Sequence, residues 1–290
     1  MDFLNSVCEY INETAAEVKV SVHSTLKNNG VRLSGLSFSR DGYNAAPTIY
    51  MENYYVEYMN GSDITEIGDR ILALYYENDL AVNFDMSFFD DFDMIKDRLY
   101  IKLINREKNI DFLKEAPYEE FLDLAVVAYV RVYDKKIGNG LIMVRNEHLK
   151  LWGKEAKEVL AAARKNTHDH DGFNIRHILD VLKTMGTAMP EVDPSDFPMY
   201  VATNHKMTNG AAVLTMNDKL REYADVIGGD YYVIPSSVHE LILIPRERST
   251  SEAGNIDDLI REVNTRHLGP DDVLADHVYL YSSEDDVFIF

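Results

Sequence analysis

Histidine, serine and carboxylate side chains that could act together are concentrated in the C-terminal third of the chain. A short segment there combines two serines, a histidine and a glutamate, the residue types that hydrolases use as nucleophile, base and acid. Two more histidines and an asparagine lie nearby in the sequence. These candidates for a polar binding or hydrolytic site are Ser236, Ser237, His239, Glu240, Asn204, His205 and His277.

None of these candidates completes a known catalytic motif. His239-Glu240 begins like a zinc-protease helix, but Leu243 stands where the second histidine is required, and the alternating pattern predicts a strand. The serines lack the glycines of a nucleophile elbow, and Pro-Ser-Ser is also an ordinary turn composition. A triad needs a third orienting group that the sequence does not place, so no residue is assigned as catalytic.

Two polar runs contain metal-ligand residue types with unsuitable spacing. His168-Asp169-His170-Asp171 approaches the two-metal pattern of metallo-β-lactamases, but Gly172 stands where that pattern needs its aspartate. The acidic run at 85–97 lacks the glycine and glutamate of a calcium loop. We expect a solvated loop and a solvated acidic face, with weak surface affinity for Zn²⁺ or Ni²⁺ through His168 and His170 as the alternative to the first. The sequence therefore predicts no metal site.

Nucleotide cofactors are not expected either. Gly138-Asn139-Gly140 lacks the remaining residues of a phosphate-binding or dinucleotide-binding loop, and no Gly-Lys-Ser/Thr occurs in the chain.

The acidic charge of the chain is concentrated in two stretches. The 290 residues carry 49 Asp and Glu against 29 Lys and Arg, a formal net charge of −20. Residues 51–100 hold 12 acidic and 3 basic side chains, and residues 251–290 hold 10 and 2. Such a surface repels phosphate groups, so we expect neither nucleic-acid binding nor docking to an anionic membrane.

Four tyrosines lie beside the first acid-rich stretch, at Tyr50, Tyr54, Tyr55 and Tyr58. Tyrosine next to acidic side chains suits recognition of a basic or polar partner, because it offers rigid contact area and a hydroxyl group. Packing of the same tyrosines in a core is the alternative.

Composition predicts a folded protein of a reducing compartment. Apolar residues make up 46% of the chain, and aromatic residues are spread along it. The single cysteine, Cys8, lies on an apolar helical stripe and cannot form an internal disulfide. No signal peptide is recognisable at the N-terminus, and the longest apolar run, residues 124–130, is too short to span a bilayer. We therefore expect a soluble, cytoplasmic protein.

Hydrophobic periodicity predicts an α+β protein, because helices and strands occur in local groups without regular βαβ alternation. We expect mixed or antiparallel sheets with hairpins, packed against amphipathic helices, in two lobes. Three prolines within nine residues, Pro190, Pro194 and Pro198, indicate a linker. The predicted division is an N-terminal lobe over 1–145, a helical connector over 146–198 and a C-terminal lobe over 199–290.

The patterns also place individual elements. Helices are predicted over 2–13, 64–74, 106–114, 156–164, 175–185, 217–227 and 255–263. Strands are predicted over 18–22, 31–38, 99–104, 122–132, 141–144, 200–203, 211–214, 231–234, 239–244, 277–281 and 287–290. The run 166–172 is expected to be a loop between two helices.

Several segments together resemble an uncharacterised bacterial family, domain of unknown function 5688, from about residue 40 to the end. They are P-T-I-Y at 47–50, K-L-I-N-R-E-K-N at 102–109, L-W-G at 151–153, M-Y-V-A-T-N at 199–204 with G-A-A at 210–212, Y-Y-V-I-P-S-S-V-H-E-L-I-L-I-P at 231–245, R-E-V-N at 261–264 and L-A-D-H-V-Y-L-Y at 274–281. The resemblance implies a cytoplasmic bacterial protein and supplies no activity, substrate or site.

Three hypotheses remain from the residues. The leading one is a non-enzymatic module that binds a protein or peptide partner, basic in character, through an acidic surface. The second is a hydrolase with a non-standard polar site in the C-terminal lobe, and whether the chain is an enzyme stays open. The third is a small-molecule-binding regulatory module. The sequence does not indicate an oligomeric state.

Overall fold

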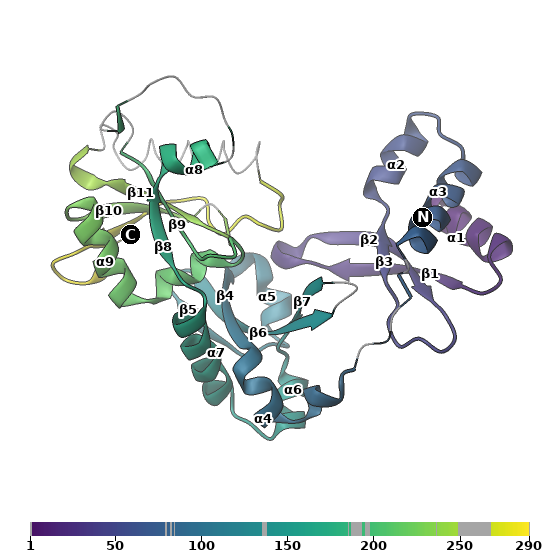
Figure 1. The fold of residues 1–290 in the computed structure, drawn as a ribbon, viewed down its shortest axis with the longest axis horizontal. Helices are drawn as coiled ribbons and strands as arrows, with labels where there is room; N and C mark the ends of the chain where they lie inside the picture. The colour runs from purple at the N-terminus through teal and green to yellow at the C-terminus, as the bar shows by residue number, and fades with distance from the viewer. Residues whose placement is uncertain are drawn as a thin grey trace. The chain divides into compact units, whose positions relative to one another are not determined.

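The computed structural model describes residues 2–78, 80–81, 83, 85–134, 138–184, 186, 193–194, 198–235, 237–248 and 268–289. The chain forms two compact units (Figure 1). Unit 1 comprises residues 1–89 and 132–140, and unit 2 comprises residues 90–131 and 141–290. The boundaries predicted near residues 145 and 198 fall inside unit 2, and the three-part division remains a prediction.

The predicted α+β class is confirmed. The described strands form three sheets, of three, six and four strands, and every pair whose register is defined is antiparallel. Helices pack against the sheets rather than alternating with parallel strands. Among the described residues, no helix combines the length and the apolar character needed to cross a membrane.

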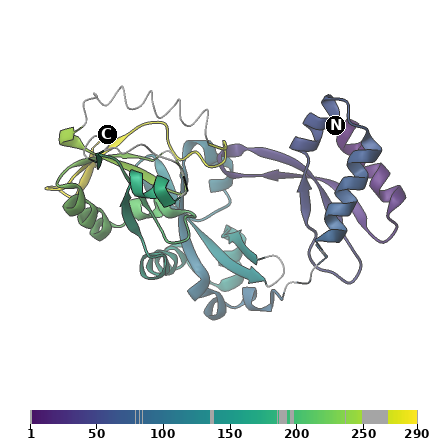
Figure 2. The same ribbon diagram turned by 45° about the horizontal axis from the view of Figure 1, so that its top comes forward.

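Unit 1 is a three-stranded sheet with helices on one side. Its sheet has the order β1-β2-β3, and α1 and α3 lie side by side in both Figure 1 and Figure 2. The elements are α1 (Asp2–Thr14), β1 (Lys19–Leu26), η1 (Asn28–Gly30), β2 (Arg32–Ser39), β3 (Thr48–Tyr50), α2 (Glu52–Met59), α3 (Ile64–Glu77) and η2 (Ser87–Asp90).

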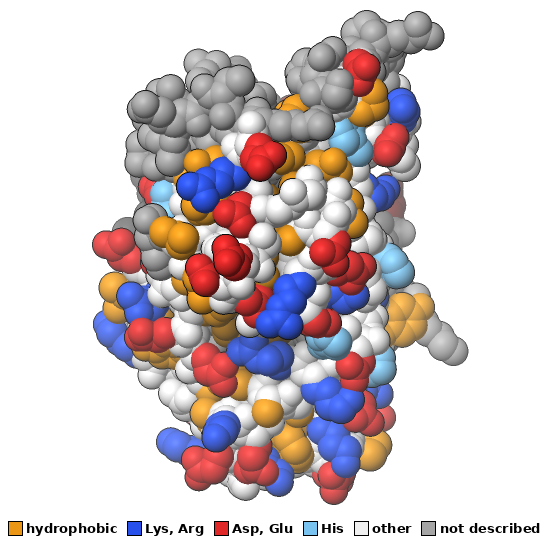
Figure 3. Space-filling view, turned by 90° about the vertical axis from the view of Figure 1, so that its left-hand side faces the viewer, with side chains coloured by type: hydrophobic (Ala, Val, Ile, Leu, Met, Phe, Trp, Pro, Cys, Tyr) orange, Lys and Arg blue, Asp and Glu red, His pale blue; other side chains and the backbone are white. Residues whose placement is uncertain are grey.

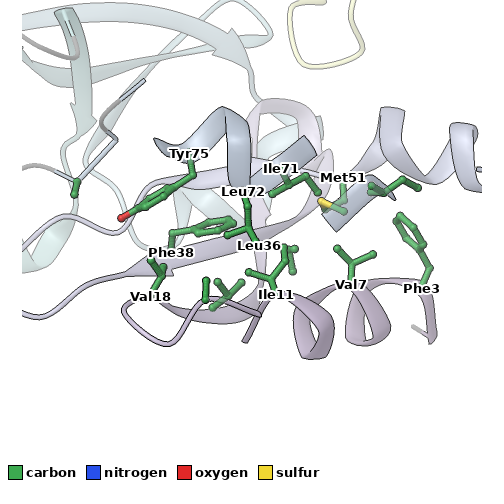
Figure 4. Packing of buried hydrophobic residues seen from close by; sticks show 14 residues of the cluster. Phe3, Val7, Ile11, Val18, Leu36, Phe38, Met51, Ile71, Leu72 and Tyr75 are labelled. Atoms are coloured by element: carbon green, nitrogen blue, oxygen red, sulfur yellow. The ribbon is translucent and has the colours of Figure 1, made fainter. Parts of the chain in front are cut away.

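The core of unit 1 forms where the apolar stripes of α1 and α3 meet the sheet. Residues three and four apart on α1 point inward (Figure 4), and they pack with side chains of α3 and β2. The cluster is Phe3, Val7, Ile11, Ala15, Val18, Val20, Leu36, Phe38, Met51, Ile67, Ile71, Leu72, Tyr75 and Ala81. Gly68 allows α3 to approach α1, because a Cβ atom there would lie 2.3 Å from the ring of Tyr10.

Unit 2 contains a six-stranded sheet of order β13-β12-β10-β11-β9-β8 and a smaller sheet in which β6 lies between β4 and β5 and also pairs with β7. Its helices are α4 (Phe92–Ile95), η3 (Lys96–Arg98), η4 (Glu107–Asn109), α5 (Ile110–Leu113), α6 (Asn146–Trp152), α7 (Ala156–His170), α8 (Ile178–Thr184), η6 (Gly210–Thr215), α9 (Asn217–Ile227) and η7 (Arg246–Arg248). The strands are β4 (Leu99–Asn105), β5 (Tyr118–Phe121), β6 (Leu124–Asp134), β7 (Gly138–Met143), β8 (Asn174–His177), β9 (Tyr200–Thr203), β10 (Tyr231–Ile234), β11 (Leu241–Pro245), β12 (Tyr279–Ser282) and β13 (Val287–Ile289). Residues 132–134 of β6 and 138–140 of β7 belong to unit 1.

Side chains of α7 satisfy the free edge of β4. The Thr167 hydroxyl accepts a hydrogen bond of 2.9 Å from the Ile101 backbone N–H. The Asn166 amide donates to the carbonyl oxygens of Leu99 (2.9 Å) and Lys96 (2.7 Å). An uncovered strand edge exposes unpaired backbone groups, so these contacts fix α7 against β4. They thereby set the position of the residues that follow α7.

Most predicted elements occur, and three local predictions are wrong. Residues 166–170 belong to α7 instead of a loop, and residues 174–177 form a strand before the short helix α8. Residues 210–215 form a 3₁₀ helix where a strand was expected, and all five residues from Gly210 to Leu214 are buried. Buried apolar runs do not distinguish a strand from a helical turn by periodicity. The helix predicted over 255–263 lies outside the described residues.

We expect Ile71→Ala to destabilise unit 1 by about 2–5 kcal/mol, because Ile71 is fully buried in α3 and truncation leaves a cavity. Leu74→Ala, three residues further along the same helix, is the matched control. Leu74 is 40% exposed, and its loss should be about 1 kcal/mol or less. Urea denaturation followed by far-UV circular dichroism measures both. Equal losses for the two variants would contradict this packing.

Candidate functional site

The predicted site residues of unit 2 fall into two groups. Asn204, Ser237 and His239 join one polar network, with His205 and Glu240 next to them in the chain. His277 lies in a separate cluster with Asp123. Ser236 lies outside the described residues.

A buried ion pair lies at the centre of the network. Asp171 caps the C-terminal end of α7, and its side chain is 1% exposed. The Arg131 guanidinium makes two contacts with this carboxylate, Nη1–Oδ1 at 2.7 Å and Nη2–Oδ2 at 3.0 Å. The same guanidinium donates to the Tyr129 hydroxyl (3.0 Å) and stacks 3.4 Å from the centre of the Tyr100 ring. The Arg131 side chain is 19% exposed. Its ion pair, hydrogen bond and stacking contact replace the interactions with water that the guanidinium loses on burial.

The loop after β9 closes over this ion pair. The Asn204 side-chain amide donates to Asp171 Oδ2 (3.3 Å) and to the Thr208 carbonyl (2.9 Å). The loop is strained, because Met207 and Asn209 both have positive φ, 51° and 55°. Gly172 lets His205 approach, since a Cβ atom there would lie 2.4 Å from the imidazole Nδ1. Strain of this kind persists only where surrounding contacts determine the conformation.

Both ring nitrogens of His239 are engaged. Its Nδ1 accepts from the Asn209 backbone N–H at 3.2 Å, so Nε2 carries the proton and donates to Asp272 Oδ1 at 3.1 Å. The Ser237 hydroxyl accepts from the His239 backbone N–H at 3.0 Å. This arrangement orients the corner but leaves no imidazole lone pair facing the Ser237 hydroxyl.

The Pro-Ser-Ser-Val-His-Glu corner is tied to the segment before β12. Val238 N–H donates to the Asp272 carbonyl, and Ala275 N–H donates to the Pro235 carbonyl, each at 2.9 Å. The Asn105 side chain, at the end of β4, donates to the Leu274 carbonyl at 3.0 Å. The corner therefore joins the two sheets of unit 2.

Lys102, on β4, belongs to the same region. Burial lowers the pKa of its ammonium group, and the nearby carboxylates of Asp272 and Asp271 offset only part of that effect.

The second group surrounds His277. Its Nε2 lies 3.5 Å from Asp123 Oδ1, and its Nδ1 lies 3.5 Å from Asp276 Oδ1. Tyr279 also donates a short hydrogen bond to Asp123. Asp123 follows Leu122, which has a positive φ of 55°, in the turn between β5 and β6. A positive φ is unusual for leucine. The turn with this backbone conformation places the Asp123 carboxylate beside His277.

These contacts shift the titration of both partners. The hydrogen bond to Asp123 raises the pKa of His277, against the opposing effect of burial. For Asp123, burial acts to raise the pKa, but hydrogen bonds from His277 and Tyr279 outweigh it and lower the pKa.

Unit 1 carries a different kind of site, a pocket beside α2. The pocket has a volume of about 380 Å³. Phe3 stacks on Tyr58 with ring centres 4.9 Å apart and lies 5.5 Å from Tyr55. Tyr55 and Tyr58 remain 48% and 38% exposed. The lining residues are Phe3, Leu4, Ser34, Met51, Glu52, Tyr55 and Tyr58.

The helices around this pocket are acidic. The sequences of α1, α2 and α3 contain eight Asp or Glu and one basic residue, Arg70. Arg70 is paired with Glu57 at 2.7 Å and lies over the Tyr54 ring. The face of unit 2 seen in Figure 3 is different, because Lys and Arg side chains are intermixed there with Asp and Glu.

No group of three or more His, Cys, Asp or Glu side chains in the described part of the chain is arranged to hold a metal ion. His168, from the His-Asp-His-Asp run, is bound by carboxylates instead. Its Nε2 lies 2.8 Å from Asp218 Oδ2, and this hydrogen bond, together with that to Asp169, raises the pKa of His168.

The model of a family of unknown function, DUF5688, matches residues 1–283. The chain belongs to this family. The match extends the resemblance, which began near residue 40, through α1 and the β1–β2 hairpin. No curated protein and no solved structure matches the chain. Membership of DUF5688 supplies a family and no activity.

Sequence reasoning missed the charged residues that hold the site together, Arg131, Asp171, Asp123 and Asp272. Arg131 had a signal, as the one charge in a strand that is otherwise apolar from residue 124 to 132. Asp171 was considered only as a metal ligand, and Asp123 and Asp272 were not singled out as site residues. Each of these residues has a partner far away in the sequence, so local patterns could not pair them. The separations are 40 residues for Asp171–Arg131, 156 for Asp123–Tyr279 and 33 for Asp272–His239.

We expect Asp171→Asn to destabilise unit 2 by about 3 kcal/mol, because it leaves the Arg131 charge out of water without its partner. Asp169→Asn is the control, since Asp169 pairs with Lys165 on the surface and should contribute about 1 kcal/mol or less. Urea denaturation monitored by the single tryptophan, Trp152, reports on unit 2. Comparable stability of the two variants would refute the importance of the buried pair.

The His277–Asp123 contact should make stability depend on pH. Because the pKa of His277 is raised in the folded protein, its contribution to the free energy of unfolding is fully present below the ordinary histidine pKa of about 6.5. That contribution is lost as the pH rises through the pKa of His277 in the folded protein. His277→Gln should reduce this loss and leave the part due to His168, whose pKa is also raised, whereas His23→Gln, at an exposed position of β1, should leave the whole loss in place. Denaturation midpoints measured from about pH 5 to pH 9 test this, and an unchanged profile in His277→Gln would disprove it.

Proposed function

We propose that this DUF5688 member is a non-enzymatic module that binds a protein or peptide partner through the α2 face of unit 1. The observation that carries the proposal is that α2 has no buried residue, although five of its eight residues are Tyr, Val or Met. Val56 and Met59 are 58% and 66% exposed. A helix this short is marginal alone, and exposed contiguous apolar surface marks an interaction site.

Charge complementarity selects a basic partner. Arg70 is the only basic residue in the three helices and is already neutralised by Glu57, so the surroundings of the pocket are acidic. Opposite charge around an apolar anchor steers association and fixes orientation. The occupant we propose is a Lys- and Arg-rich segment of another protein.

The pocket supplies the anchor point. Its walls of Phe3, Tyr55 and Tyr58 suit one aliphatic or aromatic side chain, and tyrosines pre-positioned by stacking lose little entropy on binding. The arrangement combines a central apolar anchor with a charged rim, as in other protein interfaces.

The hydrolase hypothesis has weaker support. His239 uses both ring nitrogens for contacts with Asn209 and Asp272, so it has no free lone pair to act as a base in this conformation. The polar corner is accounted for by its bonds to the segment before β12.

We place this function in the bacterial cytoplasm. Cys8 supports that placement, because its thiol donates to the Val20 carbonyl and burial raises its pKa, as for a packed thiol kept reduced.

Fluorescence anisotropy with labelled 15-residue peptides tests the proposal. Lys- and Arg-rich peptides that carry one Leu or Phe should bind, and added salt should weaken this binding. Asp- and Glu-rich peptides of the same length should not bind. Tyr55→Ala with Met59→Ser should weaken binding about tenfold or more.

Tyr133→Ala is the matched control, because Tyr133 is 69% exposed and lies outside the pocket. Circular dichroism checks that each variant is folded. Absence of saturable binding by every basic peptide, or equal weakening by Tyr133→Ala, would overturn the assignment of the α2 face.

A further inference from the structure

A second cavity, in unit 2, lies between the end of β4, the helix α5, the strand β5 and the segment around His277. Its volume of about 670 Å³ is in the range of small-ligand sites. It is lined by Asn105, Arg106, Glu107, Lys108, Ile110, Leu113, Lys114, Tyr118, Glu120, Asp123, Asp276 and His277.

The lining carries both signs of charge, and part of it is internally paired. Arg106 binds Glu120 at 2.6 Å, and Lys114 binds Asp111 at 2.7 Å. Lys108 is exposed, and across the described residues its ammonium group makes no ion pair or hydrogen bond. The cavity therefore retains a cation available to a ligand.

The lining also includes an exposed carboxylate. Asp276 is 58% exposed and contacts His277 only at 3.5 Å, whereas Asp123 also receives the Tyr279 hydroxyl. A neutral imidazole has one N–H, so only protonated His277 can donate to both carboxylates. Asp276 is the more weakly held of the two and is the one that a ligand cation can engage.

The lining also contains apolar side chains. Ile110 is 54% exposed and Tyr118 is 39% exposed, and Leu113 lies with them in the lining. Exposed apolar side chains inside a charged cavity favour a ligand that has an apolar middle and charged ends.

We propose that this cavity binds a free di- or tripeptide, with its carboxylate on Lys108, its ammonium group on Asp276 and an apolar side chain against Ile110 and Tyr118. The site lies in unit 2 and uses none of the residues of the α2 face, so it is independent of the proposed protein-binding function.

The test uses the tripeptide Ala-Leu-Ala with free termini, together with its N-acetylated form, its C-amidated form and the doubly blocked form that carries both groups. In ¹⁵N-resolved NMR titrations of the full chain, the free tripeptide should shift amides within 105–118 and 276–277. Lys108→Gln should weaken the free form about fivefold and leave the C-amidated form unchanged. Asp276→Asn should weaken the free form similarly and leave the N-acetylated form unchanged.

Lys183→Gln is the matched control, because Lys183 is an exposed lysine outside the cavity, and it should not alter the affinity. Equal affinity of free and doubly blocked peptide, equal effects of Lys108→Gln and Lys183→Gln, or no saturable shift at millimolar peptide would each overturn the proposal. None of these results depends on whether basic peptides bind to α2.

Discussion

The buried ion pair between Asp171 and Arg131 determines how unit 2 is assembled. One carboxylate at the end of α7 receives an arginine from β6 and an amide from Asn204 in the loop after β9. Because an unpaired charge in this position would be costly, the pair fixes the relative placement of α7, the small sheet and the large sheet. Asn204 also binds Thr208 between Met207 and Asn209, and the Asn209 backbone N–H donates to His239.

Unit 1 depends on a simpler constraint, which is the packing of the apolar stripes of α1 and α3 against the sheet. This packing leaves most of α2 exposed. The buried core includes Met51, just before α2, and Tyr54 of α2 packs against it while staying partly exposed. The polar Ser237–His239 corner of unit 2 is hydrogen-bonded within the fold, whereas Val56 and Met59 of α2 in unit 1 are largely exposed. That contrast is why a binding role is assigned to α2 and a structural role to the Ser237–His239 corner.

Local patterns predicted much of the fold. The amphipathic helices α1, α3 and α9 and the hairpin of β10 and β11 carry clear periodicity, and the structure confirms them. Periodicity did not reveal that α7 continues through His170, because its last turn is polar on all sides. The tyrosines of α2 were identified as a recognition signal, but their exposure depends on what the rest of unit 1 leaves uncovered. The pairing of Asp171 with Arg131 and of Asp123 with His277 is a property of the tertiary structure alone.

The central claim is that each unit carries a separate binding surface, and one NMR measurement tests it directly. A Lys- and Arg-rich peptide with one leucine and the tripeptide Ala-Leu-Ala are added in turn to the ¹⁵N-labelled full chain. The account predicts two disjoint sets of shifted amides, one within α2 and the start of α1, the other within 105–118 and 276–277. Overlapping sets, or shifts in neither region, would contradict it.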